Sequence, residues 1–240
     1  KFDFIRQEKG TWASAEDINS ATLFIATGNG AFRTVDLPSS LNIKGSEVSL
    51  FVGDFNGDGS DDFISQCFKT ASTYLPSLFI SNGNDGFDVQ SLKGKVLSAE
   101  QAKLHIGNFD GDKRVDFLLQ QHAEISNPNA YLYQSASVVK PFYYYAYQLK
   151  TYSIPASVTN LDIGDFNGDG KSDIIRQEKG AWDDDDTPIV SVLFSNAVEK
   201  NQRYDSQVSG ASAFTVVDLP NDLDLKGDDC TLLVTNHPGN

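Results

Sequence analysis

The chain has 240 residues, 40% of them hydrophobic and 22% charged, which is the composition of an ordinary globular protein. Its formal net charge of −14 argues against a nucleic-acid binder, because such proteins need clusters of Lys and Arg, and it makes cations the expected partners. The apolar residues come in short runs, and no run approaches the roughly 20 residues that a membrane-spanning helix needs.

Strand-like runs alternate with polar turns along the whole chain. The first three runs cover 2–7, 22–26 and 32–37, with TGNGAF as a tight turn between the last two. Three groups of four runs follow, at 48–52, 62–66, 77–81 and 87–92, at 103–106, 116–120, 130–134 and 142–149, and at 160–163, 173–177, 190–195 and 214–219. No stretch has helical periodicity, so we predict an all-β chain.

An internal repeat organises these runs. VGDFNGDGSDDFISQ, IGNFDGDKRVDFLLQ and IGDFNGDGKSDIIRQ begin at residues 52, 106 and 163. Four short antiparallel strands in each repeat are typical of a β-propeller blade, with a β-sandwich or β-solenoid as the alternative. We predict one propeller domain over 1–240, with blades at 46–95, 101–155 and 158–220 and a split blade made of 226–240 and 1–38.

Each repeat contains a nine-residue loop with oxygen-bearing side chains at positions 1, 3, 5 and 9. Hard oxygen ligands at alternate positions, with a backbone carbonyl at position 7 and a turn residue at position 6, suit Ca²⁺, whereas Mg²⁺ prefers to keep several waters. The predicted side-chain ligands are Asp54, Asn56, Asp58, Asp62, Asn108, Asp110, Asp112, Asp116, Asp165, Asn167, Asp169 and Asp173. The predicted carbonyl ligands are Ser60, Arg114 and Lys171.

The middle loop departs from the other two at position 6, where Lys113 replaces glycine. A left-handed backbone at a residue with a side chain costs about 1 kcal/mol, and a nearby ammonium repels a cation. We expect this calcium site to be the weakest of the three.

The GDFNGDGxxD motif resembles the FG-GAP or VCBS-type repeats of calcium-binding propellers, as in integrin α-subunit heads and propeller lectins. The resemblance covers essentially the whole chain. It implies a propeller whose calcium loop joins the first and second strands of each blade, with the acidic side chains named above as ligands, and it implies rings of mostly seven blades.

The two ends of the chain occupy equivalent places in the repeat. Residues 214–240 align with 32–58, so that Asn236, Pro238 and Asn240 fall on calcium-loop positions and Asp3 on a ninth position. Pro238 has no side-chain oxygen, so a calcium ion at this terminal loop is doubtful. We expect either a four-bladed ring in which 229–234 supplies the first strand of the split blade, or an arc excised from a larger, seven-bladed propeller.

Antiparallel blades place the calcium loops on one face and the longer loops on the other. On that second face both tryptophans stand beside acidic residues, an arrangement that suits stacking on a sugar ring. The candidate ligand residues are Trp12, Tyr74, Trp182, Asp183 and Asp184. The alternative is that the tryptophans fill gaps between blades.

Catalytic and redox motifs are missing from the sequence. The three histidines have no Ser or Cys companion in a nucleophile motif, and Cys67 and Cys230 fit no zinc or redox spacing, so we expect buried thiols or a single bridge. The sequence contains no Met and no signal peptide, which fits a mature or excised piece.

The sequence therefore predicts a non-enzymatic, secreted or cell-surface calcium-binding propeller that recognises glycans in the manner of a lectin, or a protein partner, as in cell adhesion. Two alternatives stay open. One is a scaffold segment of a larger bacterial toxin or adhesin, and the other is a polysaccharide lyase or hydrolase on the same fold.

Overall fold

The computed structural model describes residues 4–7, 21–41, 43–70, 75–83, 85–93, 96–122, 130–136, 144–149, 152, 154–157, 159–179, 190–196 and 213–220. The chain divides into two compact units, Lys1–Glu100 and Gln101–Asn240. The described elements are β-strands apart from one 3-10 turn, η1 (Ser39–Leu41). No helix in these ranges has the length and apolar character required to cross a membrane.

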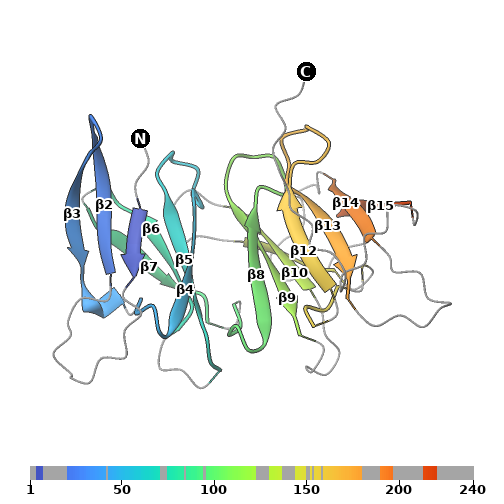
Figure 1. Ribbon diagram of the computed structural model, residues 1–240, viewed down its shortest axis with the longest axis horizontal. Helices are drawn as coiled ribbons and strands as arrows, with labels where there is room; N and C mark the ends of the chain where they lie inside the picture. The colour runs from blue at the N-terminus through green and yellow to red at the C-terminus, as the bar shows by residue number, and fades with distance from the viewer. Residues whose placement is uncertain are drawn as a thin grey trace. The chain divides into compact units, whose positions relative to one another are not determined.

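The first unit contains two antiparallel sheets (Figure 1). The three-stranded sheet is built from β1 (Phe4–Gln7), β2 (Ala21–Gly28) and β3 (Ala31–Leu37). The four-stranded sheet is built from β4 (Val48–Gly53), β5 (Asp62–Cys67), β6 (Ser77–Ser81) and β7 (Phe87–Ser91). In both sheets every strand pairs with the next strand along the chain, which makes each sheet a simple meander.

The second unit contains two four-stranded meanders. The first is built from β8 (Ala102–Gly107), β9 (Asp116–Gln121), β10 (Ala130–Ser135) and β11 (Tyr144–Gln148). The second is built from β12 (Thr159–Gly164), β13 (Asp173–Glu178), β14 (Val190–Ser195) and β15 (Phe214–Asp218). These strands confirm the predicted runs, and most strand ends lie within about two residues of the predicted ends.

The three four-stranded sheets correspond to the predicted blades at 46–95, 101–155 and 158–220. The three-stranded sheet corresponds to the part of the split blade at 1–38. Its predicted fourth strand, at 229–234, lies outside the described residues, as do both chain ends. The split blade and the single closed ring therefore stay predictions.

The tight turn between β2 and β3 follows from its residues. Gly28, Asn29 and Gly30 all have positive φ, at 95°, 54° and 75°, a conformation that glycine and asparagine adopt at low cost. The corresponding turn between β6 and β7 has Gly83 at 75° and Asp85 at 60°. The Asn-Gly signals in the sequence therefore predicted both hairpins correctly.

Aromatic side chains stack across neighbouring strands at the same place in several sheets. Phe63 on β5 lies directly opposite Phe79 on β6, and their ring centroids are 4.4 Å apart. Phe117 and Tyr133 repeat this stack in the next sheet, with centroids 4.6 Å apart. A shared register places these residues on one face of each sheet, so the pattern is a consequence of the repeat.

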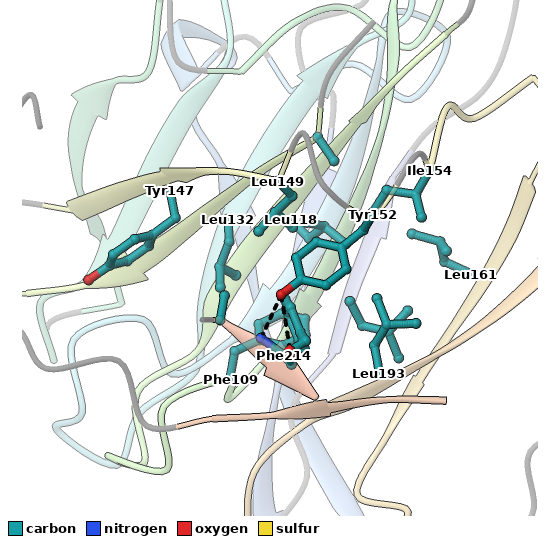
Figure 2. Close-up of a cluster of buried hydrophobic side chains, with 13 residues drawn as sticks. Phe109, Leu118, Leu132, Tyr147, Leu149, Tyr152, Ile154, Leu161, Leu193 and Phe214 are labelled. Carbon is teal, nitrogen blue, oxygen red and sulfur yellow. Dashed lines mark hydrogen bonds between the residues drawn. The ribbon is translucent and has the colours of Figure 1, made fainter. Parts of the chain in front are cut away.

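Each unit has its own apolar core. In the first unit the core joins Ala21 and Leu37 of the three-stranded sheet to Phe63 and Phe79 of the four-stranded sheet. In the second unit a larger core lies between the two meanders (Figure 2). There the Tyr152 hydroxyl donates a hydrogen bond to the carbonyl of Phe214 and accepts one from its N–H, both at 3.0 Å.

A fully buried aspartate at the ninth loop position opens the second strand of each complete sheet. Asp62, Asp116 and Asp173 are each 0% exposed. One carboxylate oxygen of Asp116 accepts the N–H of Phe109 in the loop at 2.9 Å, and the other accepts the N–H of Ser135 at the end of β10 at 2.7 Å. Each aspartate thus ties its loop to the third strand of its own sheet.

A glutamine at or near the end of a strand ties neighbouring sheets together in each unit. Gln7 donates a hydrogen bond to the carbonyl of Ile43, which precedes β4, at 3.0 Å. It donates another to the carbonyl of Val48, the first residue of β4, at 3.3 Å. In the second unit Gln120 donates to the hydroxyl of Thr159, at the start of β12, at 2.9 Å. The repeated glutamine satisfies backbone or side-chain acceptors where one sheet passes to the next.

Replacing the buried carboxylate of Asp116 should destabilise the protein. Asp116→Ala leaves two buried N–H groups without their acceptor, which costs about 2 to 5 kcal/mol of unfolding free energy. Urea unfolding in EDTA measures this loss without a metal contribution. The control Asp36→Ala removes an exposed carboxylate and should cost about 0.5 kcal/mol or less, so equal losses in the two variants would contradict the assigned role.

Candidate metal centres

The three predicted calcium loops connect β4 to β5, β8 to β9 and β12 to β13. All three have a left-handed backbone at the fourth and sixth positions. The φ values are 79° and 86° for Gly57 and Gly59, 78° and 74° for Gly111 and Lys113, and 77° and 83° for Gly168 and Gly170. The positive φ at Lys113 confirms the strained position expected in the middle loop.

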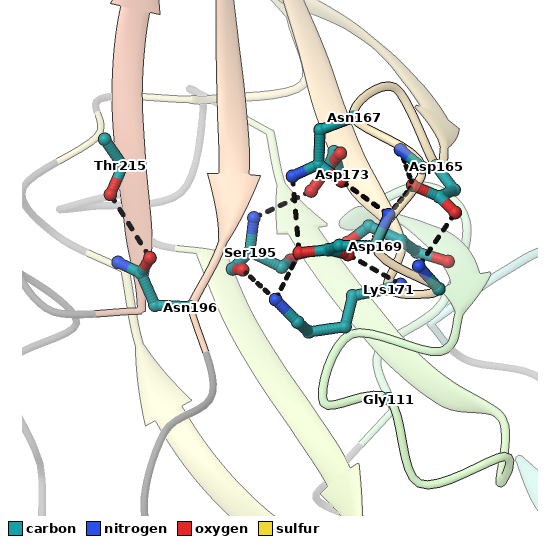
Figure 3. Close-up of polar contacts among 12 residues, drawn as sticks. Gly111, Asp165, Asn167, Asp169, Lys171, Asp173, Ser195, Asn196 and Thr215 are labelled. Atoms are coloured by element: carbon teal, nitrogen blue, oxygen red, sulfur yellow. Dashed lines mark hydrogen bonds and ion pairs between the residues drawn. The ribbon is translucent and has the colours of Figure 1, made fainter.

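The first-position side chain lies inside its loop. The two carboxylate oxygens of Asp165 accept the N–H groups of Gly168, Asp169 and Gly170 at 2.7, 3.1 and 2.9 Å (Figure 3). Asp54 makes the same three contacts in its loop. These N–H groups hold the chain in a tight turn around the carboxylate.

The middle loop has an amide at this first position. Asn108 accepts one hydrogen bond from within its loop, from the N–H of Gly111 at 2.9 Å. An amide also has less negative charge to offer a cation than a carboxylate has. Both features support the prediction that the middle loop is the weakest cation site.

The third and fifth positions also point into the loop. The amide oxygen of Asn56 accepts the N–H of Asp58 at 2.7 Å, and the Asp58 carboxylate accepts the N–H of Ser60 at 2.8 Å. The corresponding contacts recur in the other two loops. Side-chain oxygens at the third and fifth positions therefore accept N–H groups of their own loop in all three loops, and their role as metal ligands stays a prediction.

The seventh position holds a contact that sequence reasoning missed. We assigned Arg114 and Lys171 as ligands through their carbonyls alone, and that role stays a prediction. In the structure their side chains fold back and pair with the fifth-position carboxylates of Asp112 and Asp169. Nothing in the linear spacing distinguishes this arrangement from a solvated side chain.

Burial and neighbouring carboxylates raise the pKa of two ninth-position carboxyl groups. Burial raises the pKa of Asp62 to about 7, and the negative charge of Asp58 adds to that rise. Burial also raises the pKa of Asp116 well above its usual value, with Asp110 and Asp112 as further causes. Carboxylates that repel one another are stabilised in their charged form by a nearby cation.

The donor set fits a hard cation such as Ca²⁺, because its atoms are carboxylate, amide and carbonyl oxygens. Within the described ranges no three His, Cys, Asp or Glu side chains gather as a metal-ligand group. In each loop the first-, third- and fifth-position side chains accept the loop's own N–H groups, which holds their oxygen atoms against the loop backbone.

The two loops of the second unit are in direct contact. The hydroxyl of Ser172 accepts the N–H of Asn108 at 2.9 Å, and the N–H of Ser172 donates to the carbonyl of Asn108 at 2.7 Å. A Cβ on Gly107 would lie 2.8 Å from the Ser172 side chain, so the absence of a side chain permits this approach. Ser172, at the eighth position of the loop at 165–173, thus fixes Asn108, at the first position of the loop at 108–116.

The predicted ligand residues on the opposite face are not described. Trp12, Tyr74, Trp182, Asp183 and Asp184 all lie outside the described residues. The same holds for Asp3, Asn236 and Asn240 of the doubtful terminal site and for Cys230. Their grouping into a sugar site therefore stays a prediction.

Two other residues singled out from the sequence, a histidine and a cysteine, lie within the described residues. His105 lies on β8, where its Nε2 is 3.0 Å from the side-chain oxygen of Gln120, and burial lowers the pKa of its imidazole. Cys67 is a buried free thiol, as expected.

No protein-family model and no curated protein matches the chain. Among solved structures the chain is similar to a lectin from Agrocybe aegerita described for specific recognition of non-reducing terminal N-acetylglucosamine, with a TM-score of 0.55 and 20% identity. The match covers 84% of this chain and 46% of that one, so this chain spans about half the length of the structure it resembles. Together with the antiparallel meanders, this similarity confirms the predicted fold class, an all-β propeller.

Proposed function

We propose that this chain is a calcium-stabilised propeller module, secreted or at the cell surface, that recognises glycans. The proposal of calcium binding rests on the common geometry of three loops. In each loop, side-chain oxygens at alternate positions accept N–H groups of the same tight turn. Ca²⁺ would be held by the first-, third-, fifth- and ninth-position side chains and the seventh-position carbonyl. The bound ion would neutralise part of the negative charge of the clustered carboxylates.

Calcium suits these loops better than magnesium does. Ca²⁺ accepts six to eight oxygen ligands in flexible geometry, whereas Mg²⁺ demands a near-ideal octahedron and keeps several waters. Loops of this kind in extracellular modules bind calcium in about the 0.1 to 1 mM range, which matches the concentration outside cells. The proposed secreted or cell-surface location is the setting in which sites of that affinity would be filled.

The glycan part rests on two separate lines of support. One is the similar lectin, which is described for recognition of terminal N-acetylglucosamine. The other is the pair Trp12 and Trp182, which fall at equivalent places in the repeat beside acidic residues. A flat aromatic ring stacks on the C–H face of a sugar while nearby oxygens bind its hydroxyls.

Calcium should raise the thermal stability of the protein. At 5 mM, about 5 to 50 times a Kd of 0.1 to 1 mM, calcium stabilises the folded state by about 1 to 2 kcal/mol per site. Differential scanning calorimetry in 5 mM CaCl₂ and in EDTA measures the shift, with MgCl₂ as the matched control. Equal melting temperatures in CaCl₂ and in EDTA would contradict the calcium proposal.

The predicted sugar face should lose binding when its tryptophans are removed. Trp12→Ala and Trp182→Ala should each weaken binding to N-acetylglucosamine-terminated glycans on an array by about fivefold or more, since a buried aromatic contact is worth about 1 kcal/mol or more. Phe32→Ala, which removes an aromatic ring that is 48% exposed on β3, is the control and should bind normally.

An array that binds nothing would favour the scaffold hypothesis over the lectin hypothesis. Release of products from uronate-containing polymers would favour the enzyme hypothesis. Binding that is unchanged in both tryptophan variants would contradict the assigned sugar face and leave the lectin role to another surface.

A further inference from the structure

The seventh loop position differs in charge among the three candidate calcium loops. It is Ser60 in the first loop, Arg114 in the middle loop and Lys171 in the third. The backbone at this position is the same in all three, since each N–H donates to the fifth-position carboxylate at 2.8 to 2.9 Å. The side chain is therefore the variable feature.

Lys171 lies between its loop and the sheet. Its ammonium pairs with the Asp169 carboxylate and donates to the carbonyl of Ser195, at the end of β14, at 2.9 Å (Figure 3). The side chain is 20% exposed, so it is held against the protein. The ammonium is the largest cause of a lowered pKa at Asp169.

Arg114 repeats the arrangement in the middle loop. Its guanidinium pairs with Asp112 and donates to the carbonyl of Ser135 from Nε and Nη2, at 3.3 and 3.1 Å. Ser135 ends β10 as Ser195 ends β14, so the two cationic groups use equivalent acceptors. The middle and third loops therefore carry a positive charge at the same position, held by equivalent contacts.

The first loop has a neutral hydroxyl at this place. The Asp58 carboxylate receives the amide of Asn56 at 2.8 Å and the N–H of Ser60 at 2.8 Å. Neither of these groups carries a net charge. The fifth-position carboxylate of this loop therefore keeps its full charge for a bound metal ion.

We propose that Lys171 and Arg114 are internal counter-ions that set the calcium affinity of their loops. This inference rests on the proposed calcium binding. A metal ion at either loop must compete with a tethered cation for the fifth-position carboxylate and is repelled by it. The loop at residues 54–62 is consequently the tightest site, the loop at 165–173 is weaker, and the loop at 108–116, with Lys113 as well, is the weakest.

The counter-ions have a second consequence in the absence of metal. Each ties the fifth position of its loop to the third strand of the same sheet through a carbonyl oxygen. The second and third loops are therefore stabilised without calcium, whereas the first loop depends on the metal for neutralisation of its carboxylates.

A reciprocal exchange between two loops tests the inference. Isothermal titration with CaCl₂ should give Lys171→Ser an affinity about tenfold higher at one site, because a charge-assisted hydrogen bond of about 1.4 kcal/mol no longer competes. Ser60→Lys should lower the affinity of the tightest site by a similar factor. Lys93→Ser, which removes an exposed lysine from the first unit, controls for the change in net charge.

Melting in EDTA provides a readout that does not depend on metal. Lys171→Ser should melt below the wild type in EDTA and show a larger rise on addition of calcium. Lys171→Met, which keeps the length of the side chain and removes its charge, should behave in the same way, and circular dichroism verifies that each variant is folded.

The outcomes separate the two proposals. Calcium binding by the wild type with affinities that change less than twofold in both exchange variants would overturn the counter-ion role and leave calcium binding intact. No heat of binding in the wild type or any variant would overturn the proposed calcium function, and the counter-ion role with it.

Discussion

The structure depends on a buried carboxylate at the ninth position of each loop. Its two oxygens accept N–H groups from the loop and from the end of a strand about 20 residues further along the chain, as in the Asp116 contacts to Phe109 and Ser135. A buried acceptor with two donors fixes the loop relative to the sheet. Because the same contact recurs in every complete sheet, the loops share one conformation.

This constraint connects stability to function. Hydrogen bonds shape the loop before any cation enters, so the first-, third- and fifth-position oxygens are already close together. Binding of a metal ion would therefore cost little conformational entropy. The clustered negative charge is the cost of that arrangement. The middle and third loops then have two means of neutralisation, a divalent ion or a side chain of the protein, and Lys171 at the third loop is the clearest case of the second.

Much of the fold could be predicted from the sequence because the repeat fixes both strand spacing and turn residues. The strand positions, the Asn-Gly turns and the left-handed Lys113 all follow from local pattern. The folded-back side chains of Arg114 and Lys171 could not be predicted, since their acceptors, Ser135 and Ser195, come more than 20 residues later and are brought near only by the sheet. The contact between Ser172 and Asn108 likewise joins two repeats and has no local signal.

The central claim is that the loops are calcium sites. The most direct measurement is a crystal structure of the protein grown in CaCl₂, with anomalous data to identify the ion. We predict a calcium peak in the loop at 54–62, with oxygens of Asp54, Asn56 and Asp58 at about 2.3 to 2.6 Å from the ion. Loops that keep their internal hydrogen bonds and show no anomalous peak at millimolar calcium would contradict it.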